Sequence, residues 1–280
     1  MSDDADLQQL VAQVGRGKKY ASIHKGLIAH LVEDEFRHRG NVKEAIKATR
    51  RKLHQAGAVY MAGAQQRYDR WLEGIQRAAA SGDQTELKSV CRSAMATHQS
   101  SRERLPILDR FYQEVLGDLA PVPSVIDLAC GLNPLAIPWM PLASGAEYRA
   151  CDIFEDLMHF LGAALPLLGV RSDARAVDLT GEISIPSAKV ALLLKTIPCL
   201  EQLDRTAGAR LLDTVPARYL VVSYPVQSLG GRRDRGMPEH YRAHFETLTA
   251  GKPWPIRSWS YESELVYLVD KGDQAENDGG

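Results

Sequence analysis

Three acidic residues and one glycine stand where short apolar runs end, and at these positions they could bind a polar ligand. Asp127 ends the run 123–126 and Gly131 lies in the turn after it, while Asp152 and Asp178 end the next two runs. An ionised carboxylate accepts hydrogen bonds through two oxygens, so it can hold a ribose diol or an exocyclic adenine amine. A tight glycine turn lets backbone amides approach a ligand closely. The four positions together indicate a ligand that carries ribose and adenine.

The turn holds a single glycine, so the GxGxxG fingerprint of dinucleotide-binding proteins is absent. A ligand with ribose and adenine but without pyrophosphate fits better, which favours S-adenosylmethionine (SAM) over NAD. Both later carboxylates have a structural alternative, because an Asp at a strand end also caps helices and closes turns. Asp152 could cap the predicted helix 155–168, and Asp178 could close a turn.

Apolar runs alternate with helical patterns in the second half of the chain, and this order predicts the fold that positions these residues. Such a βαβαβ order gives an α/β fold with a doubly wound, mostly parallel sheet. Ligands of such sheets bind at the carboxyl ends of the strands. We expect strands at 124–128, 146–153, 171–177, 188–194 and 218–223, helices at 155–168, 198–212 and 238–248, and a closing hairpin at 256–260 and 264–269.

The first 120 residues show helical patterns from residue 5 onward, which predicts an N-terminal all-helical domain at 1–120 and a sheet domain at 121–270. The last of these helices is expected from residue 100 or 101 to 116, with Pro106 tolerated in its first turns. Residues 271–280 have the composition of a disordered tail.

Charge is distributed unevenly between the two halves. Residues 15–110 hold 19 Lys or Arg and 10 Asp or Glu, whereas residues 111–280 hold 15 and 22. A basic unit joined to an acidic one indicates a module that faces a polyanion. The alternative is a set of scattered, solvated cations.

The composition is that of a soluble globular protein, with 45% hydrophobic and 25% charged residues. No run approaches the ~20 apolar residues of a membrane span. The first six residues are acidic and lack the apolar segment of a secretory signal. The four cysteines show no metal-binding spacing. We therefore expect a cytoplasmic protein without a disulfide and without a metal ion.

Several motifs together identify a family. DLACGLNPL at 127–135, LLLKTIPCLE at 192–201, and SLGG at 228–231 followed by GM at 236–237 resemble the aminoglycoside-resistance methyltransferases that modify N7 of guanine 1405 in 16S ribosomal RNA. HQSSRERL at 98–105 and KLH at 52–54 are similar to the same family. The likeness runs from about residue 18 to residue 268. It implies a SAM-dependent enzyme that acts on the assembled 30S subunit.

The resemblance also implies roles for residues of the cofactor site. Arg104 would bind the methionine carboxylate of SAM, a group that a guanidinium fork suits in geometry. Asp152 would hold the ribose, and Asp178 with Leu179 would meet the adenine. The remaining implied contacts are Gly131, Leu194, Tyr60, His98, Gln99 and Ser100. The alternatives are a surface position for Arg104 and core positions for Tyr60 and His98.

The target pocket has fewer candidates. No catalytic acid or base is expected, because N7 of guanine carries a lone pair and no proton. Lys195 and Glu201 would shape the pocket floor, unless they form a structural ion pair with each other. Tyr224 is the candidate aromatic platform for a flipped guanine, although the family usually has Phe there. Gln227 stands where Lys or Arg is usual.

Cations of the helical domain and of a late loop are the candidates for contact with ribosomal RNA. They would read phosphates and shape rather than bases. The predicted helix that follows Asn41 can lay several of them along a phosphate backbone. The candidates are Lys18, Lys19, Lys43, Lys47, Arg50, Arg51, Lys52, Arg67 and Arg70, with Arg232, Arg233 and Arg235 in the loop.

The sequence thus predicts a monomeric enzyme that methylates guanine 1405 at N7 and confers resistance to 4,6-disubstituted 2-deoxystreptamine aminoglycosides. Three alternatives stay open. The first is methylation of adenine 1408 at N1, which the motifs disfavour. The second is a 30S-binding factor without transfer activity. The third is a small-molecule methyltransferase, in which the basic helices would have no purpose.

Overall fold

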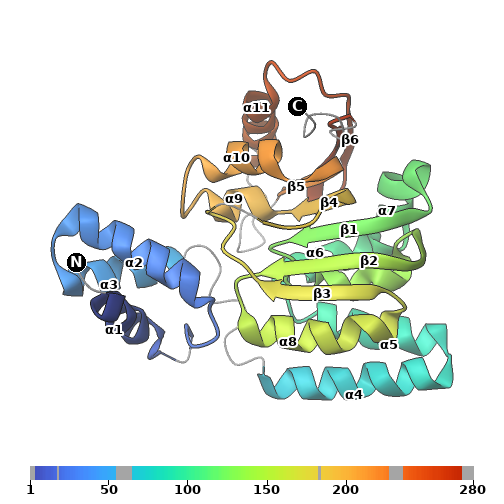
Figure 1. The fold of residues 1–280 in the computed structure, drawn as a ribbon. Coiled ribbons are helices and arrows are strands. Elements are labelled where there is room, and N and C mark those ends of the chain that lie inside the picture. The colour runs from blue at the N-terminus through green and yellow to red at the C-terminus, as the bar shows by residue number, and fades with distance from the viewer. Residues whose placement is uncertain (1–3, 18, 55–64, 182–183, 227–235, 273–280) are drawn as a thin grey trace, which may run out of the picture.

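The computed structural model describes residues 4–17, 19–54, 65–181, 184–226 and 236–272, and a seven-stranded sheet forms its centre (Figure 1). The strand order is β3-β2-β1-β4-β5-β7-β6. The strands are β1 (Val122–Leu128), β2 (Leu142–Asp152), β3 (Arg171–Ala176), β4 (Ala188–Leu194), β5 (Ala217–Pro225), β6 (Ile256–Ser260) and β7 (Glu264–Asp270). β1 to β5 run parallel, while β7 is antiparallel to both β5 and β6. The predicted doubly wound sheet and closing hairpin are therefore confirmed.

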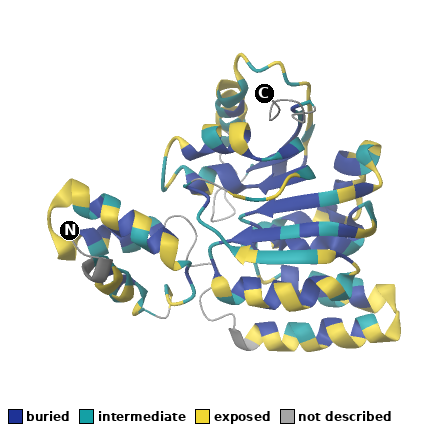
Figure 2. Ribbon diagram, in the orientation of Figure 1, coloured by how far each residue is buried: buried dark blue, intermediate teal, exposed yellow. Residues whose placement is uncertain are grey.

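Side chains of the central strands alternate between two faces of the sheet, and each face has its own core. In β1, Val125 lies in one core, while Ile126 and Leu128 lie in the other. Because these strands are buried on both faces, their sequences are almost continuously apolar. Figure 2 shows that the central strands are buried and that the helices beside them expose their outer faces. One side carries α4 (Gln65–Ser81), α5 (Gln84–Met95) and α8 (Glu155–Ala164), and the other carries α9 (Thr196–Leu200), α10 (Ala207–Thr214) and α11 (Met237–Thr249).

Prolines interrupt two of the predicted helices. The helix expected from residue 100 or 101 to 116 is instead α6 (Gln99–Arg104), a 3₁₀ turn at Leu105–Ile107, and α7 (Leu108–Leu116). Pro106 has no N–H to donate and its ring crowds the preceding turn, so the continuous helix is wrong. Pro166 likewise lies where α8 gives way to a 3₁₀ turn, Leu165–Leu168. The predicted helix 198–212 is also divided, into α9 and α10.

The helices before the sheet belong to two groups. α1 (Asp4–Gly15), α2 (Lys25–Arg39) and α3 (Val42–Leu53) pack on one another and lie beside the carboxyl ends of the strands (Figure 1). α4 to α7 pack against the sheet layer instead. One continuous core joins Leu10 of α1 to Leu268 of β7. The division into domains at residue 121 stays a prediction. Of the proposed tail 271–280, Lys271 is buried and its Nζ donates to the carbonyls of Leu212, Asp213 and Val215, so it belongs to the fold, while residues 273–280 lie outside the described residues.

Candidate functional site

The turn after β1 is bonded to both neighbouring strands at their carboxyl ends. The Gly131 amide donates to Asp152 Oδ2 over 2.8 Å, and the Cys130 amide donates to the Cys151 carbonyl over 3.0 Å. On the other side, Thr196 Oγ1 donates to the Leu128 carbonyl over 2.9 Å. β1 lies between β2 and β4, where the strand order reverses. The structure thus brings Gly131 and Asp152 together at the edge where parallel sheets bind ligands.

Gly131 has no room for a side chain, and its φ of +50° favours glycine. A Cβ at this position would lie 2.8 Å from Cε1 of His98. Burial, together with the smaller effects of the Arg104 and Lys195 cations, lowers the pKa of His98 to about 4. The imidazole is therefore neutral at pH 7 and packs directly against the glycine turn.

Both carboxylate oxygens of Asp152 accept backbone N–H groups. Oδ2 accepts from Gly131, and Oδ1 accepts from Ile153 over 2.7 Å. The helix α8 begins at Glu155, and its N-cap residue is Phe154. Asp152 lies two residues before the N-cap, so its interpretation as the helix cap is wrong. Burial raises the pKa of Asp152, while these N–H donors oppose the rise. The carboxylate fixes the turn, and each oxygen keeps further capacity to accept a bond.

Arg104 is fully buried, so its interpretation as a surface residue is wrong. Its Nε and Nη2 donate to the two carboxylate oxygens of Glu264 over 2.7 and 2.8 Å, and Nη1 donates to Asn133 Oδ1 over 2.9 Å. Burial alone would raise the pKa of Glu264, but Arg104 and Lys195 hold it below its usual value. A guanidinium has five N–H donors, so two remain for a ligand.

Asp127 lies at the other end of this buried network. Its Oδ2 accepts from Asn133 Nδ2 over 2.8 Å and from the Tyr148 hydroxyl over 2.7 Å. Its Oδ1 has no hydrogen-bond partner in the described part of the chain. Burial raises the pKa of Asp127 to about 7, although both donors and Arg104 oppose the rise. Asn133 therefore links the carboxylate to the guanidinium, a role that the sequence did not indicate.

Asp127→Asn should flatten the pH dependence of stability between about pH 4 and about pH 7. The folded protein keeps this carboxyl protonated to a higher pH than the unfolded chain does. Over that range the folded state binds more protons, so the free energy of unfolding falls as the pH rises. Asn keeps the acceptor for Asn133 and Tyr148 but does not titrate. Urea unfolding at both ends of the range measures the difference, and an equal fall in both proteins would contradict the assignment.

Lys195 and Glu201 do not pair with each other, so that structural alternative is wrong. Lys195 Nζ donates to Glu103 Oε2 over 2.6 Å, and Gln99 Nε2 donates to Glu103 Oε1 over 3.0 Å. Glu201 instead contacts His244 Nε2 at 3.0 Å. Lys195 directly follows buried Leu194, and Ser100 lies half-buried in α6. The structure therefore joins Lys195 and Gln99 through Glu103 across the strand ends.

Tyr224 is fully buried, so the prediction that its ring offers an aromatic platform is wrong. The ring stacks on Tyr241 with centroids 4.9 Å apart, and Phe245 meets it edge-on. Leu220, Val222 and Tyr224 alternate along β5 into the same core beneath α11. The partly exposed Tyr241 covers the ring from outside.

Asp178 closes a turn and also contacts α2. Its Oδ1 accepts from the Thr180 amide over 2.8 Å and from Thr180 Oγ1 over 2.5 Å, which agrees with the turn alternative. Its Oδ2 lies 3.0 Å from His30 Nδ1. The Val177 amide donates to the Asp152 carbonyl over 2.8 Å, and Leu179 is buried. Asp178 is thus held one strand away from Asp152 at the same edge of the sheet.

The candidate RNA-binding cations fall into two classes. Lys19, Lys43, Lys47, Arg51, Arg67 and Arg70 are exposed. Arg50 is half-buried and donates to the carbonyls of Gln13 and Val14, while Lys52 pairs with Glu35 at 2.8 Å. These two cations hold α1, α2 and α3 together. Tyr60, Lys18, Arg232, Arg233 and Arg235 lie outside the described residues.

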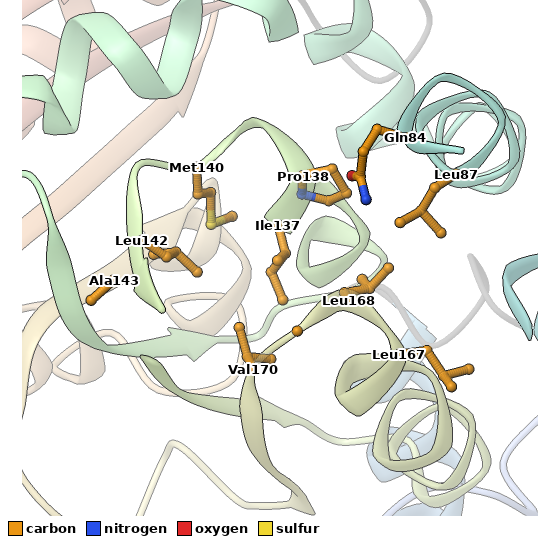
Figure 3. Close-up of a pocket in the computed structure, with 11 residues that line it drawn as sticks. Gln84, Leu87, Ile137, Pro138, Met140, Leu142, Ala143, Leu167, Leu168 and Val170 are labelled. Carbon is orange, nitrogen blue, oxygen red and sulfur yellow. The ribbon is translucent and has the colours of Figure 1, made fainter. Parts of the chain in front are cut away.

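A cavity of about 290 Å³ lies at the opposite edge of the sheet, where β2 and β3 begin (Figure 3). Its lining includes Leu87, Met140, Leu142, Leu168 and Val170, and it contains none of the candidate site residues. Among the described residues, no cluster of three His, Cys, Asp or Glu could hold a metal ion. Within the same residues, no helix is both long and apolar enough to cross a membrane.

Comparison with known proteins identifies the family over nearly the full chain. Residues 16–268 match the family described as "Ribosomal RNA methyltransferase (FmrO)". The chain is 36% identical over 269 residues to a 16S rRNA (guanine(1405)-N(7))-methyltransferase of Micromonospora rosea, covering 96% of this chain and 98% of that protein. An enzyme of the same name from Frankia casuarinae is 37% identical over 271 residues, covering 96% and 95%. The crystal structure of the 16S rRNA methyltransferase RmtF in complex with S-adenosyl-L-homocysteine (SAH) matches with a TM-score of 0.80 at 29% identity, covering 97% of this chain and 100% of RmtF. The chain therefore belongs to the FmrO family of ribosomal RNA methyltransferases.

Proposed function

We propose that the protein transfers a methyl group from SAM to N7 of guanine 1405 in 16S ribosomal RNA. It acts as a monomer on the 30S subunit in the cytoplasm and confers resistance to 4,6-disubstituted 2-deoxystreptamine aminoglycosides. The observation that carries the proposal is the 36% identity with a relative of that activity over 96% of the chain. The match covers the basic helices as well as the sheet, so it includes the parts that would dock on RNA.

The residues at the sheet edge fit SAM. Asp152 keeps acceptor capacity for a ribose diol, and the turn at Gly131, which has no side chain, would let a ligand approach the backbone closely. A contact with the methionine carboxylate would use the two remaining N–H donors of Arg104, because its Nε–Nη2 fork is bonded to Glu264. The other proposed cofactor contacts are His98, Gln99, Ser100, Asp178, Leu179 and Leu194.

The side chains of this site orient the reactants rather than move protons. When bound, the cofactor supplies a methyl group activated on a sulfonium. Guanine N7 attacks with its lone pair, so a nitrogen–carbon bond forms as the carbon–sulfur bond breaks, and no proton leaves N7. The chain must hold the three atoms nearly in line and expose the base. Lys195, which Glu103 fixes beside Leu194, would line the floor of the pocket.

One assay tests the proposal. Purified protein is incubated with 30S subunits and methyl-labelled SAM, and the product is mapped by cleavage specific for N7-methylguanine. Label at guanine 1405 is expected. The absence of label from 16S RNA would overturn the proposal, as would label at N1 of adenine 1408.

An exposed stripe of three cations on α3 should carry part of the affinity for the 30S subunit. Lys43, Lys47 and Arg51 recur every four residues and all three are exposed, so they share one face of the helix. Replacing all three by Ala should weaken 30S binding roughly tenfold and reduce the slope of log affinity against log salt by about 2. Filter binding at several salt concentrations measures both quantities.

The matched control removes three exposed cations elsewhere: Arg110, Arg171 and Arg205. Its net charge is the same as that of the α3 variant, so a similar loss in both proteins would show a general charge effect and contradict the assignment. SAH affinity should stay unchanged in both variants.

A further inference from the structure

The three N-terminal helices α1, α2 and α3, with the segments that join them, form one group, here called the α1–α3 unit. This unit is hydrogen-bonded to the sheet layer next to Asp152, the candidate ribose contact. Ile23 forms an antiparallel bridge with Phe154. The His24 amide donates to the Ile153 carbonyl, and the Glu155 amide donates to the Ser22 carbonyl, both over 2.7 Å. These backbone bonds occupy the residues that directly follow Asp152. The segment that leads into α2 is therefore fixed to the carboxyl end of β2.

A second attachment joins α2 to the end of β3. His30 Nδ1 lies 3.0 Å from Asp178 Oδ2, although 148 residues separate the two in the chain. The imidazole is 49% exposed and the carboxylate 15% exposed. Thr180 Oγ1 also lies 3.3 Å from His30 Nδ1. One histidine of the α1–α3 unit thus contacts the candidate adenine-binding residue directly.

His30 fixes the orientation of the Asp178 carboxylate. Oδ1 is held by two bonds from Thr180, and Arg210 Nη2 donates to the Thr180 carbonyl over 2.5 Å. Those bonds anchor the turn and one oxygen. In the described part of the chain, His30 is the group that contacts Oδ2, and this contact adds to the Thr180 bonds in restraining the rotation of the carboxyl group about the Cβ–Cγ bond. The direction in which the carboxylate faces therefore depends on where α2 lies.

We propose that His30 is a positioning residue that couples the α1–α3 unit to the cofactor site. It holds Asp178 in the orientation that binds the adenine amine, so the placement of α1–α3 sets cofactor affinity. Because coupling between two sites is reciprocal, cofactor binding favours the same placement of the helices and strengthens 30S binding. The inference rests on the proposed function, which assigns the adenine to Asp178 and RNA docking to α1–α3.

Three variants of the full chain test the proposal. His30→Ala removes the contact, while His30→Asn restores a donor, because the Asn amide can take the place of Nδ1. His38→Ala is the matched control, since His38 lies on the same helix and, within the described residues, its Nδ1 contacts only Asp34, at 2.7 Å from the carbonyl and 3.5 Å from the carboxylate. The dissociation constant of SAH is measured by calorimetry with and without 30S subunits, and thermal unfolding confirms that each variant is folded.

In the absence of 30S subunits, His30→Ala should weaken SAH binding about threefold to tenfold, the range of one hydrogen bond at a partly exposed site. The KM for SAM should rise by the same factor with kcat nearly unchanged. His30→Asn should recover most of the affinity, and His38→Ala should match the wild type. In the wild type 30S subunits should tighten SAH binding several-fold, and His30→Ala should lose this effect.

The proposal is overturned if His30→Ala binds SAH as the wild type does, or if the effect of 30S subunits survives the substitution. It is also overturned if His38→Ala weakens SAH binding equally. Failure of the proposed function looks different, because a wild-type protein that places no label in 16S RNA can still show the effect of His30 on SAH affinity.

Discussion

Glu264→Ala is expected to lower the free energy of unfolding by about 3–5 kcal/mol. The substitution leaves the guanidinium of Arg104, which is fully buried, without the carboxylate that accepts from its Nε and Nη2. A buried charge without a partner is among the most costly defects that a single substitution can create. Urea denaturation followed by circular dichroism measures the loss. Methyl transfer should also fall, because Arg104 no longer has a fixed orientation.

A surface ion pair provides the control. Arg257 and Asp118 form a bonded pair whose side chains are 48% and 77% exposed, so Asp118→Ala should change the free energy of unfolding by less than about 1 kcal/mol. Glu264→Gln keeps the shape and one acceptor, and it should lie between the two. If Glu264→Ala and Asp118→Ala lower the free energy of unfolding by similar amounts, the buried pair does not stabilise the fold as proposed.

Asp152→Asn should weaken SAH binding about 100-fold, which corresponds to about 2.8 kcal/mol. The two oxygens accept from the amides of Gly131 and Ile153. In the Asn variant an NH2 group replaces one of these oxygens, so it would point a donor at a backbone N–H that needs an acceptor. The glycine turn loses an anchor, and the ribose loses an acceptor. Calorimetry with SAH gives the affinity directly and needs no RNA.

Asp173→Asn is the matched control, because Asp173 lies on β3 and pairs only with Arg175 among the described residues. It should bind SAH as the wild type does. The assignment of Asp152 fails if its Asn variant keeps normal SAH affinity and instead loses binding to the 30S subunit.

The sheet could be predicted because its signals are local. The bounds expected for the fourth strand, 188–194, agree with β4, since an apolar run is required where a strand is buried on both faces. The approach of Gly131 to Asp152 also follows from parallel order alone, which places the carboxyl ends of neighbouring strands at one edge. Helix bounds were less predictable where proline lies near an end, as at Pro106.

The partners of buried side chains could not be predicted. Arg104 and Glu264 are 160 residues apart, and no periodic pattern relates a helix residue to a strand that far along the chain. His30 and Asp178 present the same difficulty. The burial of Tyr224 did leave a signal, because Leu220, Val222 and Tyr224 alternate at the period of a strand and must share a face.

Arg104, Asn133 and Glu264 come from three separate segments, and each takes up hydrogen-bonding capacity of another member of the set. Changing one alone leaves a buried charge or amide without its hydrogen-bond partner. Replacing all three together with apolar residues of similar volume can leave the stability nearly unchanged. Stepwise mutation must therefore pass through unstable intermediates. These positions would remain fixed over evolutionary time by epistasis alone. An unchanged Arg104 among relatives would consequently say as much about its neighbours inside the protein as about any ligand that it touches.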